Sequence, residues 1–204
     1  MRGVTGKRAQ VGITMMEILV TLIITLIGLL GIAALQAKAQ QAEMESYQRA
    51  QALIILSDIV DRINVNRSTV SCFVITTNTT AGTPFMGADG SGHMSTPGCA
   101  ASTAAYNTQA DAALNALDDI LEGSAETLSG NRVGAMLGAR ACISYDSTTE
   151  LSGVSGTGLY TVTVSWQGLG DLTPPVANCA NGLYGSESKR RAVTTSFRIA
   201  NLYG

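Results

Sequence analysis

The sequence contains few charged and few aromatic residues. Only 14% of its 204 residues are charged and 5% are aromatic, whereas soluble domains average about 25% charged residues. A chain with so little charge is expected to keep part of its surface away from water. Its length fits one globular domain with an attached segment and argues against two full domains.

Histidines and close-spaced cysteines are scarce as well, which narrows the kinds of site the chain could build. The single histidine, His93, lies in a glycine- and serine-rich stretch, so we expect it to be exposed and assign it no catalytic role. No Cys-x-x-Cys pair occurs, and scattered cysteines are an unusual source of zinc ligands. No nucleophile lies beside a base. We therefore expect no enzyme, no cofactor and no metal site.

Two charged clusters have ordinary structural interpretations. The carboxylates of Asp118, Asp119 and Glu122 fall on the polar side of a predicted helix and lack an EF-hand pattern, so we expect a solvated face. Residues 189–191 are the one basic run, and such a run more often flanks a strand than binds DNA. The formal net charge of −2 also gives no overall attraction to nucleic acid.

The clearest feature that is present is a long uncharged run. Residues 18–35 contain 18 residues without a charge, and as a helix they would rise about 27 Å, close to the thickness of a bilayer core. Arg2, Lys7 and Arg8 precede this run. The positive-inside rule therefore predicts a cytoplasmic N-terminus, with everything beyond Leu35 on the other side of the membrane.

An ordinary secretory signal peptide is the main alternative for this segment. Residues 37–39, Ala-Lys-Ala, have the small residues of a cleavage site. However, the apolar run is longer than the usual 7 to 15 residues, and helix-forming residues continue beyond it without a break. Glu17 also lies at the start of the run, where an unpaired carboxylate in lipid costs several kcal/mol. These features favour a retained membrane helix.

Residues 11–20 read Val-Gly-Ile-Thr-Met-Met-Glu-Ile-Leu-Val and resemble the cleavage and methylation motif of type IV prepilins. The resemblance implies that a prepilin peptidase cuts between Gly12 and Ile13 and that Ile13 is N-methylated. The family usually has Phe at the first mature position, and Ile13 departs from that pattern. No proline occurs between residues 13 and 63, where major pilins commonly have one. Gly28 and Gly31 could take its place as weaker helix-destabilising residues.

Glu17 would be the fifth residue of the mature chain. In a filament of side-by-side apolar helices, its carboxylate can pair with the N-terminal amine of a neighbouring Ile13, and this attraction would set the axial register. The alternative is that Glu17 marks the membrane boundary and reaches toward the headgroups.

Beyond the apolar run, the patterns predict an α+β fold with a pilin-like layout. Leu53, Leu56, Val60 and Ile63 recur at helical spacing, so the N-terminal helix should continue to about residue 67. A second helix is expected at residues 107–122, ended by Gly123. Alternation at residues 141–145, 160–166 and 193–199 predicts antiparallel strands, with one buried face on the strand at residues 160–166.

These patterns divide the chain into four parts. They are a prepilin leader (residues 1–12), a hydrophobic transmembrane and filament-core helix (residues 13–35), an amphipathic continuation of that helix (residues 36–67) and a globular head (residues 68–204).

All four cysteines fall in the head, and an even count in an exported region predicts two disulfides. Sequence allows three pairings. We favour the local one, Cys72 with Cys99 and Cys142 with Cys179, because each bond would then staple a loop-rich excursion to its own neighbourhood.

The strand at residues 160–166 and the C-terminal strand have a layout similar to that of the PilV family of minor pilins. The resemblance implies a minor pilin that primes assembly of a type IV pilus in a tip complex. Its partners would be other minor pilins, the major pilin, the prepilin peptidase, the inner-membrane assembly machinery and a tip adhesin. It would sit in the bacterial inner membrane before assembly, with its head in the periplasm or outside the cell. Two alternatives stay open: a minor pseudopilin of type II secretion, and a pilin whose head binds DNA or a host surface.

Overall fold

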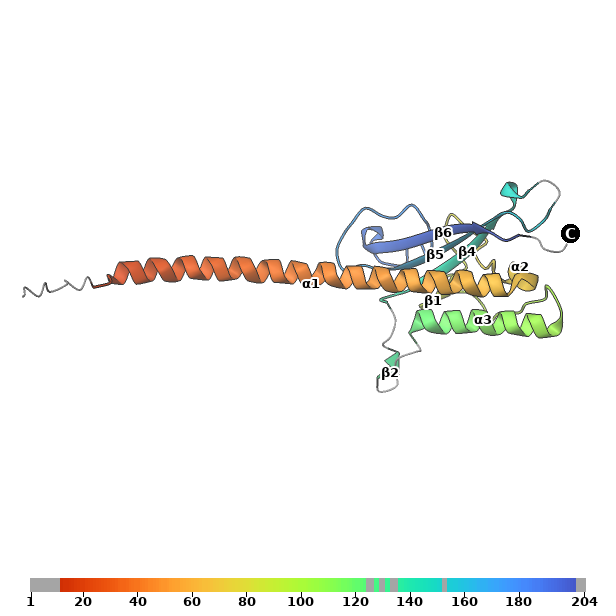
Figure 1. Cartoon of the computed structure of the whole chain (residues 1–204), viewed down its shortest axis with the longest axis horizontal. Helices are drawn as coiled ribbons and strands as arrows, with labels where there is room; N and C mark the ends of the chain where they lie inside the picture. The colour runs from red at the N-terminus through yellow and green to blue at the C-terminus, as the bar shows by residue number, and fades with distance from the viewer. Residues whose placement is uncertain (1–11, 124–126, 129–130, 133–135, 152–153, 201–204) are drawn as a thin grey trace, which may run out of the picture. The chain divides into compact units, whose positions relative to one another are not determined.

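A computed structural model describes residues 12–123, 127–128, 131–132, 136–151 and 154–200 (Figure 1). The chain forms two compact units, Met1–Met44 and Glu45–Gly204. The first unit contains the N-terminal part of helix α1 (Met15–Val65), and the second contains the remainder of that helix and all later elements. The predicted α+β fold, a long apolar N-terminal helix with an antiparallel sheet, is confirmed.

The second unit is built on a four-stranded antiparallel sheet in the order β1-β4-β5-β6. The strands are β1 (Met86–Gly87), β4 (Arg140–Asp146), β5 (Leu159–Gln167) and β6 (Arg190–Arg198). The last three correspond to the strands expected from alternation. Strand β1 has two residues, too few to produce an alternating pattern in the sequence.

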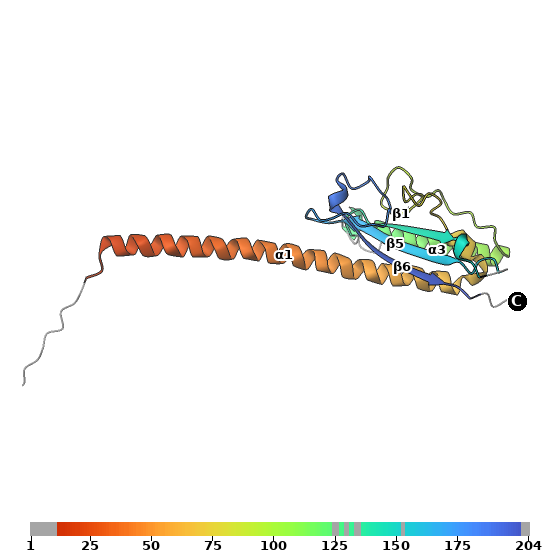
Figure 2. The same ribbon diagram turned by 90° about the horizontal axis from the view of Figure 1, so that it is seen from above.

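Two helices pack beside this sheet (Figures 1 and 2). They are the later part of α1 and helix α3 (Ala104–Glu122), which begins three residues before the predicted start. Gly123 ends α3 in the left-handed conformation, with φ 81°, as expected for a C-terminal glycine cap. Short helical turns η1 (Arg67–Thr69) and α2 (Val70–Phe73) follow α1.

The remaining regular elements are short. A hairpin of β2 (Thr127–Leu128) and β3 (Asn131–Arg132) follows α3, and the turns η2 (Ser147–Thr149) and η3 (Glu187–Lys189) precede β5 and β6.

The main core lies between these helices and one face of the sheet. Helix α1 contributes Ala52, Leu56, Ile59 and Ile63, spaced by four, three and four residues, which places them on one face of the helix. The predicted stripe was wrong at Leu53, which is 50% exposed. Leu53 is one residue, or about 100°, away from the buried Ala52 and so lies off the buried face.

The opposite face of the sheet is covered in part by a second cluster. It contains Phe85, Cys142, Cys179, Ala180 and Tyr184. Ser165 of β5 is fully buried there, and its hydroxyl lies 2.8 Å from the Tyr184 hydroxyl. The expectation of one buried face for β5 was therefore wrong, because Thr163 and Ser165 are buried as well. Tyr184, from the segment before β6, contacts Ser165, and the Thr163 hydroxyl lies 3.0 Å from that of Thr194 in β6.

Candidate functional site

Gly12 and Ile13, the residues on either side of the predicted cut, precede the first turn of α1 and are exposed; Ile13 is 73% exposed. The rest of the predicted leader, residues 1–11 with Arg2, Lys7 and Arg8, lies outside the described residues. A protease must bind its substrate in an extended conformation, and Gly12 and Ile13 lie outside the helix.

Thr14 caps the start of α1. The backbone N–H of Glu17 donates to the Thr14 carbonyl at 3.1 Å and lies 3.3 Å from the Thr14 hydroxyl. This is one half of a capping box, in which Thr and Glu three residues apart close the first turn of a helix. The sequence Thr14-Met15-Met16-Glu17 contains that signal, and our sequence analysis missed it. Glu17 therefore has a local role at the positive end of the helix, in addition to the predicted register role.

The first unit exposes nearly all of its apolar side chains. Leu22, Ile24, Leu26 and Leu30 are 58%, 64%, 60% and 70% exposed. By length and composition, α1 could cross a membrane. The hydroxyls of Thr21 and Thr25 donate to carbonyls one turn earlier, at 2.8 and 2.7 Å. These polar groups are therefore satisfied within the helix, as a hydrocarbon environment requires.

The four cysteines form two disulfides, Cys72–Cys99 and Cys142–Cys179, which is the local pairing that we favoured from the sequence. The two bonds have different surroundings. Cys142 and Cys179 are 5% and 3% exposed and belong to the second cluster. Cys72 and Cys99 are only half-buried and pack at the edge of the main core.

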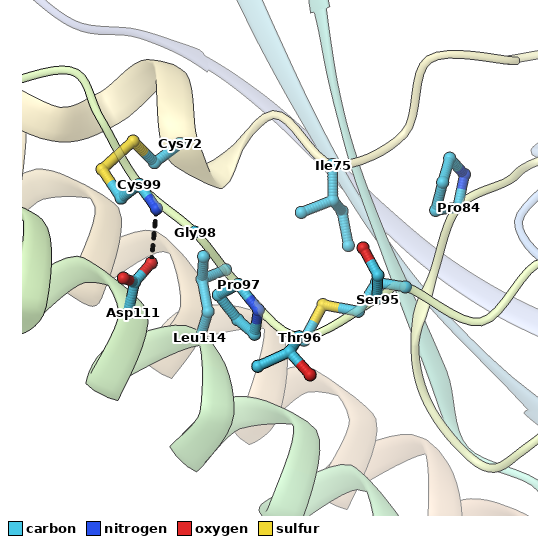
Figure 3. Close-up of a pocket in the computed structure, with 11 residues that line it drawn as sticks. Cys72, Ile75, Pro84, Ser95, Thr96, Pro97, Gly98, Cys99, Asp111 and Leu114 are labelled. Carbon is cyan, nitrogen blue, oxygen red and sulfur yellow. Dashed lines mark hydrogen bonds between the residues drawn. A yellow bond between two sulfur atoms is a disulfide. The ribbon is translucent and has the colours of Figure 1, made fainter.

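A pocket of about 240 Å³ lies beside the Cys72–Cys99 disulfide (Figure 3). Its walls include Ile75, Pro84 and Leu114, and Asp111 of α3 accepts a 2.8 Å hydrogen bond from the Cys99 backbone N–H. The volume is below the 300–1,000 Å³ typical of ligand pockets. Because Asp111 already holds the Cys99 loop, we assign no catalytic role to this pocket. Its clearest effect is to leave one disulfide beside an opening to solvent.

His93 is not the exposed loop residue that we predicted. Its side chain is 23% exposed, and its Nε2 lies 3.1 Å from Asp118 Oδ1. Asp118 is 20% exposed, so the expected solvated face was wrong at that position as well. The same oxygen of Asp118 accepts a 2.6 Å hydrogen bond from the Gly87 backbone N–H. Residues 25 positions apart in sequence thus meet, and local composition does not reveal such a contact.

The basic run at residues 189–191 is largely unavailable for binding DNA. Arg190 is 2% exposed; it binds Glu187 at 2.6 Å and donates to the Ala177 carbonyl. The Arg191 side chain is 13% exposed and bonds to Glu45 at 3.2 Å and to the Gly170 carbonyl at 2.7 Å. These arginines hold loops of the second unit in place, in agreement with the prediction of a run that flanks a strand.

Part of the chain is similar to a known protein family. A family model described as type IV pilin Tt1218 (Tt1218-like) matches residues 34–113. The match spans 80 of the 204 residues, from the end of the uncharged run to the middle of α3. It supports a type IV pilin, a structural and not an enzymatic kind of protein, and with the apolar helix it fits a membrane-anchored pilin. No curated protein and no solved structure matches the chain.

Proposed function

We propose that this chain is a minor pilin that is cut by a prepilin peptidase and incorporated into a type IV pilus. The observation that carries the proposal is the contrast along helix α1. Its first part exposes a continuous apolar surface directly after Gly12 and Ile13, and its later part is packed into a folded head. The match to type IV pilins includes the junction between these parts.

The physical steps follow from this contrast. Before assembly, the apolar part of α1 is stored in the inner membrane, with the leader in the cytoplasm and the disulfide-stapled head on the other side. After cleavage, the amine of Ile13 is released and methylated. The apolar helix then moves from lipid into a filament core of similar helices, where its exposed leucines and isoleucines stay out of water. The head determines which neighbouring subunits fit.

Glu17 is the residue on which the assembly step depends most. Its carboxylate would pair with the Ile13 amine of a neighbouring subunit, a strong interaction where water is excluded. Glu17→Gln removes the charge but leaves the Thr14 cap, whose acceptors serve the backbone N–H of residue 17. Thr14→Ala removes the side-chain half of the cap and keeps the charge.

These two variants separate the register role from the helix-capping role. We expect Glu17→Gln to enter the membrane normally and to be absent from sheared pili, whereas Thr14→Ala is incorporated. Quantification of the chain in membrane and pilus fractions gives the comparison. Full incorporation of both variants would contradict the register role, and loss of both would show that incorporation also requires the Thr14 cap.

The finer assignment is to the PilV family, with a role in priming the filament from a tip complex. The layout of β5 and β6 and the lack of a proline between residues 13 and 63 support a minor subunit over a major one. The expected partners are other minor pilins, the major pilin, the inner-membrane assembly machinery and a tip adhesin.

Deletion of the gene tests this assignment. We expect a sharp loss of surface pili, restored by the intact gene and not by a Glu17→Gln copy. Normal piliation would contradict the assignment. Normal piliation together with lost enzyme secretion would instead make the chain a pseudopilin of type II secretion.

A further inference from the structure

Metal-ligating side chains from two separate parts of the head meet beside the end of α3. Ligand atoms of Asp89, His93 and Glu122 all lie within 4.8 Å of one another. Asp118 adjoins the group through its contact with His93. The donor set combines an imidazole with carboxylates from a loop and from a helix, so it is not a row of acids on one surface helix.

The loop that carries Asp89 and His93 is held rigidly. The buried Arg140 donates from Nε to the Ala88 carbonyl at 2.9 Å and from Nη2 to the Asp89 carbonyl at 2.6 Å. At the start of the loop, Gly87 has φ 101°, and a Cβ there would lie 2.4 Å from the Ala139 carbonyl oxygen. Glycine is therefore required for the loop to approach β4 this closely.

Helix α3 contributes the other carboxylates near His93. Asp118 and Glu122 are four residues apart on α3 and so lie on neighbouring turns of one face. Glu122 is the last residue of the helix, where the helix dipole carries partial negative charge. Negative potential from the helix end and from three carboxylates thus gathers around one imidazole, an arrangement that favours a bound cation.

We propose that Asp89, His93 and Glu122 form a binding site for a divalent transition-metal ion, zinc in the first instance. Imidazole with carboxylate ligands suits zinc, whereas calcium and magnesium take oxygen ligands almost exclusively. Ligand atoms of a tetrahedral zinc site are about 3.3 Å apart at bond lengths of about 2.0–2.1 Å. The observed separations of up to 4.8 Å require small side-chain rotations.

Asp118 acts as a positioning residue. It accepts from one ring nitrogen of His93, and a carboxylate in that position orients a ligating imidazole and makes it more basic. Glu122 already has an interaction within the chain, so its carboxylate must be shared with the ion or rotate toward it. The site is independent of the proposed role in the pilus, because it lies wholly within the head.

The composition of the chain makes the test unusually clean. His93 is its single histidine, and all four cysteines are in disulfides, so neither a second imidazole nor a thiolate competes for zinc. The experiment is calorimetric titration of the full chain, without a histidine tag, in detergent micelles with zinc chloride. The imidazole resonances of His93 are followed by NMR in the same titration.

We expect one zinc ion per chain and a shift of the His93 resonances. His93→Gln and Asp89→Asn should each weaken binding at least tenfold, and Asp118→Asn should weaken it about tenfold while keeping the stoichiometry. Asp61→Asn, a change to an exposed carboxylate of α1, is the matched control and should bind like the unmodified chain.

Absence of zinc binding by the folded chain would overturn the proposal, as would His93→Gln binding zinc as tightly as the unmodified chain. Tighter binding of calcium than of zinc would also overturn it, because that result indicates a site of oxygen ligands alone. Trp166 fluorescence checks that each variant is folded. If His93→Gln does not fold, the test uses Asp89→Asn, a change in an exposed loop residue, and unweakened zinc binding by that variant would overturn the proposal.

Discussion

The two units of this chain differ in how far their apolar side chains are buried. Residues 15–44 lie in helix α1, and their leucines and isoleucines are about half to three-quarters exposed, whereas the head buries many of its apolar side chains in two clusters. Burial of a large apolar side chain is worth about 1.5–3 kcal/mol. The head can gain this free energy by folding alone, but the first unit can gain it only from lipid or from other helices.

The largest expected effect comes from placing charge in the exposed apolar surface of the first unit. Leu26→Arg with Leu30→Arg should disfavour membrane insertion by about 5–7 kcal/mol, because each arginine near the centre of a span costs about 2.5–3.5 kcal/mol. The readout is the fraction of the chain that stays with membranes after alkaline extraction.

The matched control uses exposed positions of the same helix within the head. Leu53→Arg with Ile54→Arg changes residues that are 50% and 68% exposed, and we expect no change in membrane retention. If both pairs of substitutions had the same effect, the proposed division of α1 into a membrane part and a head part would be wrong.

Removal of a large buried side chain tests the core of the head. Phe73 is fully buried, so Phe73→Ala should lower the free energy of unfolding of the head by about 3–5 kcal/mol. Leu22→Ala, in the first unit, should leave it unchanged. Denaturant unfolding in micelles, followed by fluorescence of the single tryptophan, Trp166, measures both. A comparable loss from Leu22→Ala would show that the two units do not unfold independently.

The two disulfides of the head allow a comparison of a buried bond with a more accessible one. Each closes a loop, with sequence separations of 27 and 37 residues, and should contribute about 3 to 4 kcal/mol. Their accessibility differs, because Cys142 and Cys179 are buried and Cys99 lines a pocket.

Limited reduction measures this difference. We expect a mild reductant to open Cys72–Cys99 first, and alkylation with peptide mapping identifies which thiols are released. Opening of Cys142–Cys179 at the same rate would contradict the burial assigned to that bond.

The smallest effect is a pH dependence confined to the head. Burial raises the pKa of Tyr160 to about 12, from about 10 in an unfolded chain. The unfolded state therefore releases this proton first, and the free energy of unfolding should decline as pH rises from about 10 to 12. Tyr160→Phe should show a shallower decline. An equal slope in the two proteins would exclude Tyr160 as its cause.

The elements that were predicted well are those with a local signal. The period of α1, the Gly123 stop of α3 and the alternation in β4, β5 and β6 all depend on neighbouring residues. The errors concern contacts between distant segments. Ser165 is buried by Tyr184 and His93 contacts Asp118, and neither pair has a spacing that sequence could reveal. The Thr14 cap was the exception, a local signal that went unused.

The central claim is that Ile13 begins the mature chain and that the apolar helix behind it enters a filament. Mass analysis of the N-terminus of this protein in sheared pili tests the claim most directly. We predict a chain that starts at N-methylated Ile13. A chain that starts after Ala39 would contradict the account, because the apolar helix would then have been removed as an ordinary signal peptide.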